Sequence, residues 1–106
     1  MPELSSDPFI QIIRFRVVEG QAEPLMQAIF DHLDDWISGC DGFVSSNFHV
    51  SGSGLHVINY AQWRDKTAFD GFLHHPRQPE LADAIAQQRP ERVEADSFAL
   101  VRSVTA

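Results

Sequence analysis

The residues best suited to chemistry in this chain are an amide and an indole within residues 55–64, LHVINYAQWR. The alternation of apolar residues predicts a strand there, and successive side chains of a strand point to opposite faces. Asn59 and Trp63 therefore share one otherwise apolar face, with the small Ala61 between them. A buried amide that is left without partners costs about 1–3 kcal/mol. We predict that Asn59 and Trp63 line a cavity and act as the catalytic polar groups, because both can donate hydrogen bonds to a ligand.

Two phenylalanines are expected to complete this cavity. Asp65 is a favourable N-cap for a helix that begins at Lys66, and Phe69 and Phe72 lie on the apolar side of that helix. Apolar walls with a few polar groups are the usual design of a small-molecule site, so both are predicted to bind substrate. The ordinary alternative stays open, because a buried asparagine can satisfy backbone groups and a tryptophan at a strand end is often plain core.

The chain contains five histidines, a residue type that can bind a metal or act as a base. His49 and His56 would lie opposite each other if Gly52-Ser53 formed a two-residue turn, but no third ligand accompanies them, so no metal site is predicted. His49 is a candidate general base because its intrinsic pKa suits proton transfer near neutrality, although this register places it on the face opposite Asn59. The other three are expected to face solvent or a solvated turn: His32, His74 and His75.

The order of the elements predicts the fold. Strands are expected at residues 9–18, 43–50, 55–64 and 93–104. The first helix should carry Pro24 in its first turn and Gly39 as its C-terminal cap. The second begins at Lys66, is interrupted at Pro76 and Pro79, and resumes over residues 80–88. This order is that of an α+β, ferredoxin-like split βαβ fold, with an antiparallel sheet and both helices on one face. Residues 1–8 are expected to form a flexible leader and residues 9–106 a single domain.

The uncovered sheet face is expected to bind a second copy of the chain. It should carry an apolar centre with a polar rim, which is typical of a protein interface. The expected members of this face are Ile10, Ile12, Ile58 and Tyr60, with Arg14, Arg16 and Gln62. We therefore predict a homodimer.

Composition limits the other classes of partner. The net charge of −7 and the scattered basic residues argue against nucleic acid and anionic membranes. Cys40 is the only cysteine, which excludes an intrachain disulfide and a cysteine-based zinc site. The chain has no secretory signal pattern and no apolar run near the roughly 20 residues of a membrane helix. A cytoplasmic protein is the expectation.

Several short motifs resemble the antibiotic biosynthesis monooxygenase domain. They are Gly42-Phe43, residues 48–51 (FHVS), residues 57–63 (VINYAQW) and residues 75–77 (HPR), and the likeness runs from about Phe9 to the last strand. The nearest likeness is to the small cofactor-free oxygenases that act on aromatic polyketides. The resemblance implies a ferredoxin-like dimer of the dimeric α/β-barrel type, with the active cavity between sheet and helices.

The resemblance also implies a reaction. An acidic phenol or anthrone-type substrate loses a proton, its carbanion reduces O2, and the radical pair recombines and collapses to a quinone without any cofactor. Asn59 would stabilise the oxyanion, Trp63 would orient the rings, and His49 also matches a family position. Such oxygenases carry a tyrosine at the position of Phe69. They carry an arginine at the position of Ala82 or Asp83. Arg77 is the candidate to replace that arginine in contacting the substrate.

Two alternatives to this reading stay open. One is a non-catalytic ligand-binding or stress-response dimer with the same cavity. The other is the haem-degrading branch of the family, which is disfavoured because residues 80–88 contain no histidine.

Overall fold

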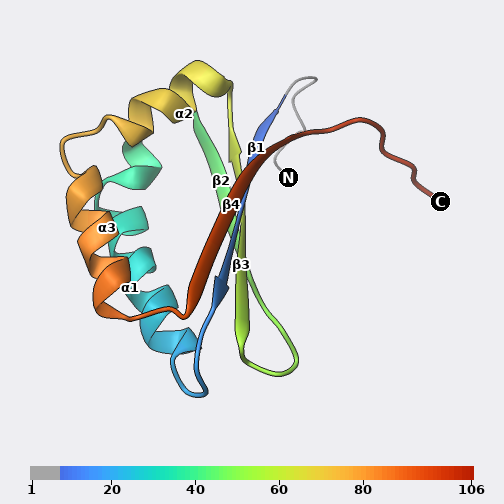
Figure 1. Ribbon diagram of the computed structural model, residues 1–106. Coiled ribbons are helices and arrows are strands. Elements are labelled where there is room, and N and C mark those ends of the chain that lie inside the picture. Colours follow the sequence, from blue (N-terminus) through green and yellow to red (C-terminus); the bar gives the residue numbers. More distant parts are fainter. Residues whose placement is uncertain (1–7) are drawn as a thin grey trace.

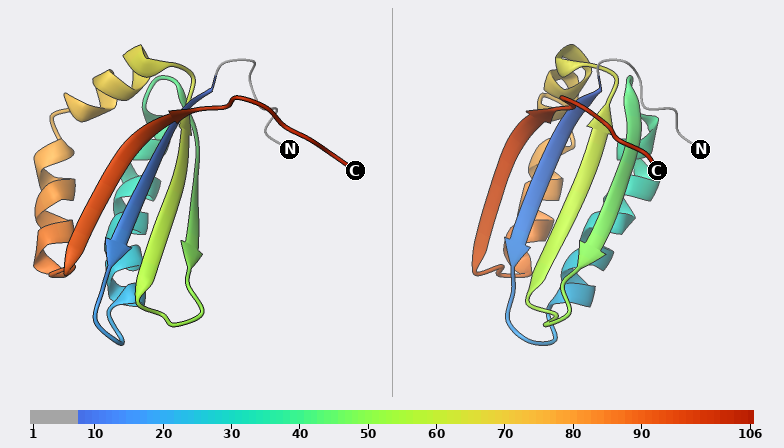
Figure 2. Two further views of the ribbon diagram at one scale, coloured as in Figure 1. Left: turned by 45° about the vertical axis from the view of Figure 1, so that its right-hand side comes forward. Right: turned by 90° about the vertical axis from the view of Figure 1, so that its right-hand side faces the viewer.

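The computed structural model describes residues 8–106, which form one antiparallel sheet covered on one face by helices (Figure 1). The strand order is β2-β3-β1-β4. The strands are β1 (Phe9–Arg16), β2 (Phe43–Val50), β3 (His56–Trp63) and β4 (Arg92–Ala99). The helices are α1 (Ala22–Asp35), the short 3-10 turn η1 (Ile37–Gly39), α2 (Lys66–Leu73) and α3 (Gln78–Gln87). The predicted α+β, ferredoxin-like class is confirmed, and Figure 2 shows the strands side by side with the opposite face uncovered.

Two of the predicted element ends are wrong. The first helix ends at Asp35 with Trp36 as its C-terminal cap, because the chain tightens into η1 before it reaches the predicted cap Gly39. The last strand ends at Ala99 rather than at residue 104, because Ala99 pairs with Phe9, the first residue of β1, and no strand lies beyond it. Residues 100–106 have no regular structure and extend away from the sheet (Figure 1). The predicted leader lies outside the described residues, apart from Pro8, which is buried.

The strand register decides which side chains face the helices. Phe15 pairs with Val57 and Ile13 with Asn59, so the odd-numbered residues of both strands share the covered face. Two hydrophobic clusters lie under the helices. One contains Phe15, Val17, Leu25, Ile29 and Val57, and the other contains Trp36, Ile37, Trp63, Ala68 and Leu81.

A β-bulge at Val44 sets the facing of β2. Phe43 pairs with Trp63, but Ser45 pairs with Gln62, so the register shifts by one residue between them. A shift of one residue turns every later side chain to the other face. Ser46 and Phe48 therefore point toward the helices.

The hairpin between β2 and β3 differs from the predicted two-residue turn. Ser51 N–H donates to the His56 carbonyl over 3.0 Å, and the Ser51 hydroxyl accepts the His56 N–H over 3.1 Å. The connecting loop therefore holds four residues, and His49 pairs with Ile58 instead of His56. The predicted pairing of the two histidines is wrong.

Helix α2 is fixed at its start by a side-chain cap and a close contact. The Ala68 N–H donates to Asp65 Oδ1 over 2.8 Å, as the predicted N-cap requires. Gly42 lies against this turn with φ +78°, and a Cβ on Gly42 would clash with the Ala68 Cβ. Glycine at 42 thus lets α2 approach the sheet closely.

No helix among residues 8–106 has the length and apolar character needed to cross a membrane.

The cap gives a pH-dependent prediction for α2. The Ala68 N–H and, secondarily, the Arg64 guanidinium lower the pKa of Asp65. A lowered pKa in the folded state stabilises the fold above the ordinary aspartate pKa, and this stabilisation is lost as the pH falls through the folded-state pKa. We expect Asp65→Ala to lower the melting temperature at pH 7, and the deficit relative to the natural chain to shrink in acid, as measured by circular dichroism.

Asp65→Asn is the matched control, because asparagine retains the capping hydrogen bond and does not titrate. Its melting temperature should lie nearer to that of the natural chain than Asp65→Ala does at pH 7. An Asp65→Ala deficit that stays constant down to pH 2 would show that the carboxylate does not act as described.

Candidate functional site

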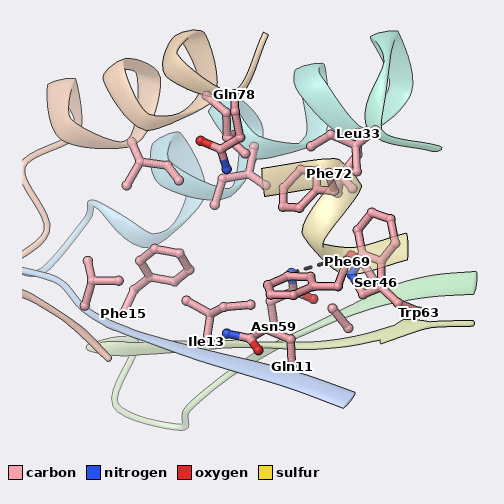
Figure 3. Close-up of a pocket in the computed structure, with 16 residues that line it drawn as sticks. Gln11, Ile13, Phe15, Leu33, Ser46, Asn59, Trp63, Phe69, Phe72 and Gln78 are labelled. Carbon is pink, nitrogen blue, oxygen red and sulfur yellow. Dashed lines mark hydrogen bonds between the residues drawn. The ribbon is translucent and has the colours of Figure 1, made fainter. Parts of the chain in front are cut away.

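A cavity of about 200 Å³ lies between the sheet and the helices (Figure 3). Asn59, Trp63, Phe69 and Phe72 all line it, so the structure brings together four of the six predicted site residues. The rest of the lining is mostly aliphatic, from β1, α1 and α3. Val93 of β4 is half exposed and also lines the cavity, which places an opening beside the β4 edge.

The amide of Asn59 is oriented by the backbone of the neighbouring strand. The Asn47 N–H donates to Asn59 Oδ1 over 3.2 Å. A backbone N–H can only donate, so the atom that faces it must be the amide oxygen. The amide nitrogen is thereby turned toward the cavity, where its one protein partner among the described residues is Ser46 Oγ at 3.5 Å. Asn59 therefore offers the cavity a donor.

Two further donors lie close to Asn59 on the same face. The Ser97 hydroxyl donates to Gln11 Oε1 over 2.8 Å, which leaves the Gln11 amide nitrogen for the cavity. The Trp63 indole lies in the wall, and no hydrogen bond from its N–H to another of residues 8–106 is found. Three N–H groups thus surround one apolar hollow, an arrangement that favours an acceptor or an oxyanion.

The aromatic wall is a set of packed rings. Trp63 stacks on Phe72 at 5.0 Å between ring centroids and meets Phe69 at 6.0 Å. Phe43 packs its edge against Trp63 at 5.4 Å. Flat, rigid walls of this kind suit a planar ligand, since aromatic rings prefer stacked or edge-to-face contact.

Among the described residues 8–106, no ionisable side chain lines the cavity. Its polar members are Gln11, Ser46, Asn59 and Gln78, besides the Trp63 indole. The cavity can therefore hold an anion through donors but contains no side chain to act as a base. Across residues 8–106, no group of three or more histidine, cysteine, aspartate or glutamate side chains is placed to hold a metal.

The two remaining predicted site residues lie elsewhere. His49 pairs with Ile58 on the uncovered face, so the bulge at Val44 leaves it on the side of the sheet away from the cavity. Arg77 immediately precedes α3, forms ion pairs with Asp35 and Glu80, and lies over the Trp36 ring at 6.0 Å. Neither residue lines the cavity.

Two histidines expected to face solvent are instead packed against Trp36. The Trp36 indole N–H donates to His32 Nδ1 over 2.8 Å. The His75 ring stacks on Trp36 at 4.3 Å, and its Nδ1 accepts the Arg77 N–H over 3.0 Å. His74 is exposed, as predicted.

Three polar lining residues were not predicted. Gln11 interrupts the apolar face of β1 as Asn59 interrupts that of β3, so the same alternation argument could have found it. Ser46 faces the cavity because of the bulge, and Gln78 because of where α3 begins. The alternation of apolar and polar residues carries neither of those signals.

Comparison with known proteins identifies the group to which this fold and site belong. The family model described as antibiotic biosynthesis monooxygenase matches residues 8–94. The chain belongs to the antibiotic biosynthesis monooxygenase family. The predicted family and monooxygenase class are confirmed at this level.

Individual relatives agree with this assignment. The chain is 33% identical over 90 residues to tetracenomycin-F1 monooxygenase of Streptomyces glaucescens, covering 84% of this chain and 80% of that protein. It is 25% identical to the monooxygenase ActVA-Orf6 of Streptomyces coelicolor, solved with nanaomycin D, with a TM-score of 0.84 over 92% of this chain and 91% of the other. SnoaB of Streptomyces nogalater, a cofactor-independent oxygenase, shares the fold at 20% identity, with a TM-score of 0.79 over 93% and 98% of the two chains.

The cavity itself can be tested by filling it. Ala61 is buried at 4% exposure on the cavity wall, and Ala61→Leu would place three more carbon atoms in the hollow. We expect this change to increase the free energy of unfolding by roughly 1–2 kcal/mol, because apolar carbon is buried without displacing protein. Denaturant titration followed by circular dichroism measures it.

A tightly packed site would respond in the opposite direction. Overpacking costs typically 1–3 kcal/mol, so destabilisation of that size would mean that no void lies beside Ala61. Ala68→Leu is the matched control, since Ala68 is equally buried but packs directly against Gly42 and should be destabilised.

Proposed function

We propose that this protein is a cofactor-independent monooxygenase that oxidises a small aromatic, polyketide-like or quinol-like molecule with O2 to a quinone. The observation that supports it most is the set of N–H donors on the wall of an apolar cavity. Its oriented amide and indole N–H groups suit the stabilisation of a phenolate or enolate oxygen inside an apolar hollow. Two of the three relatives above are named as monooxygenases, and these names support the same class of reaction.

The proposed reaction needs no group from the protein that gains or loses electrons. The substrate anion passes one electron to O2, which gives a substrate radical and superoxide. The two combine at a ring carbon to form a peroxide, which takes up a proton. The O–O bond then breaks as the C–H bond at the same carbon is lost, so that CH2 and O2 become C=O and H2O.

The protein's own contribution is binding and electrostatics. Asn59 would donate to the substrate oxygen on which the negative charge develops, and Trp63 and the phenylalanines would hold the ring plane. Since no ionisable side chain lines the cavity, the substrate's own acidity would supply the anion. Its proton would leave to water rather than to His49, which lies on the other sheet face.

The competing function is a ligand-binding protein without turnover. The lack of an ionisable side chain on the cavity wall is the observation that favours it. An oxygen electrode separates the two functions, because only the oxygenase consumes O2 when a quinol or anthrone is added without any cofactor.

Removing the Asn59 donor should reduce turnover strongly. We expect Asn59→Ala to lower kcat by about 10²–10³, the usual cost of one oxyanion donor. His49→Ala should leave kcat within about two-fold, because its ring lies outside the cavity. Both are measured by oxygen consumption with one substrate at saturation.

The source of the proton can be tested with two substrates of different acidity. If the substrate ionises by itself, the pH midpoint of the rate should move with the pKa of the substrate. A midpoint that is the same for both substrates, or one abolished by His49→Ala, would show that a protein group is the base.

We also propose that the uncovered sheet face forms a homodimer. Ile12, Ile58 and Tyr60 are only partly buried on this face, although all three are apolar or aromatic. Arg14 and His49 are exposed at its margin. An apolar centre with a polar margin is the surface that a second copy would cover.

A charge placed in the centre of this face should separate the subunits. We expect Ile58→Glu to shift the protein to a monomer in light scattering at micromolar concentration, because a buried unpaired carboxylate is strongly unfavourable. Val18→Glu is the control, since Val18 is half exposed in the turn after β1 and should not change the mass. A natural chain that is monomeric under these conditions would contradict the proposal.

A further inference from the structure

A second hollow of about 210 Å³ lies on the other side of α2 from the cavity. Its lining includes Cys40, Arg64, Thr67, Gly71 and His75. Within the described part of the chain, Phe72 is the only side chain that lines both the second hollow and the cavity. One phenyl ring therefore separates two spaces of nearly equal size.

Phe72 is held in place by the rings on either side. It stacks on Trp63 at 5.0 Å with an interplanar angle of 30°, and on Trp36 at 5.7 Å with an angle of 24°. Trp36 is itself fixed by its hydrogen bond to His32 and by the stacked His75 ring. A ring clamped between two indoles is a fixed partition, since any other rotamer would give up both stacking contacts.

The volume on the Asn59 side of this partition limits the ligand. A cavity of about 150 Å³ encloses benzene, whereas pockets for drug-sized ligands run from about 300 Å³ upward. The present cavity, at about 200 Å³, lies between these values and nearer to the first. It therefore suits one or two fused rings, and a third ring would have to leave through the opening beside Val93.

We propose that Phe72 determines the substrate specificity of this site. Resting on the proposed function, this assigns the substrate to phenols and quinols of one or two fused aromatic rings. Phe72 closes the cavity at that length, and the hollow behind it would receive a third ring if the phenyl group were removed.

A substitution at Gly71 can change the volume of the second hollow without changing the cavity. It lines that hollow but not the cavity, and a Cβ at Gly71 would meet no atom within 4 Å. Gly71→Leu therefore refills the second hollow from the adjacent position. Leucine is also the better helix former, so α2 should not be weakened.

Binding is measured without turnover, by quenching of tryptophan fluorescence under argon, with 1-naphthol as the two-ring probe and 1,8-dihydroxyanthrone as the three-ring probe. We expect the natural chain to bind the two-ring probe at least about ten-fold more tightly, and Phe72→Ala to reverse this preference. Gly71→Leu alone should change neither affinity. Added to Phe72→Ala, it should restore the preference for two rings.

Several outcomes would overturn the inference. They are a natural chain that prefers three rings, a Phe72→Ala variant with an unchanged ratio of affinities, or a Gly71→Leu effect that is equal in both backgrounds. Phe72→Leu is the second variant in case alanine unfolds the chain, and it should give an intermediate ratio. A protein that binds as described but never consumes O2 would contradict the proposed function and leave this inference standing.

Discussion

The hydrogen bond from the Asn47 N–H to the Asn59 side-chain oxygen decides the character of the cavity. Because the backbone group can only donate, it takes the amide oxygen and leaves the amide nitrogen for the interior. On the adjacent strand β1, the Ser97 hydroxyl donates to Gln11 Oε1, although a hydroxyl, unlike a backbone N–H, can also accept. Groups outside the cavity thus satisfy the acceptors of both amides, and a ligand meets donors. Two neutral amides become a site with a preference for negative charge without any positively charged side chain.

The fold and one wall of the site were predictable because they depend on local rules. Alternation placed Asn59, Ala61 and Trp63 on one face, the Asp65 cap began α2 at Lys66, and the element order gave the topology. The bulge at Val44 was not predictable from alternation, since nothing in the apolar pattern of β2 distinguishes either register. That single extra residue sends Ser46 toward the cavity and keeps His49 away from it. The predicted register already placed His49 on the face opposite Asn59. Its predicted pairing with His56 was wrong because the hairpin loop holds four residues instead of two, and loop length cannot be read from alternation.

The packing of the histidines and Arg77 depended on contacts between elements distant in sequence. His32 on α1 and His75 after α2 meet at Trp36, and Arg77 links Asp35 of α1 to Glu80 of α3. Each of these residues looks solvent-facing when its own helix is considered alone. Together they surround Trp36, which supports Phe72 from the side opposite Trp63. The polar groups nearest the aromatic wall thus stabilise its position and do not enter the cavity.

The position of the ionisable side chains outside the cavity limits the chemistry that the cavity can support. Phe69 stands where the resemblance places a tyrosine, and it presents only a hydrocarbon ring to the cavity. With no ionisable group on the wall, the protein cannot lower the barrier by removing a proton itself. It can lower the energy of the anion once formed, and it can exclude water from the radical pair. Molecules that ionise readily in water and are flat enough for the Trp63 and Phe72 wall therefore meet both demands of the site. A weakly acidic ring of the same shape would bind and not react.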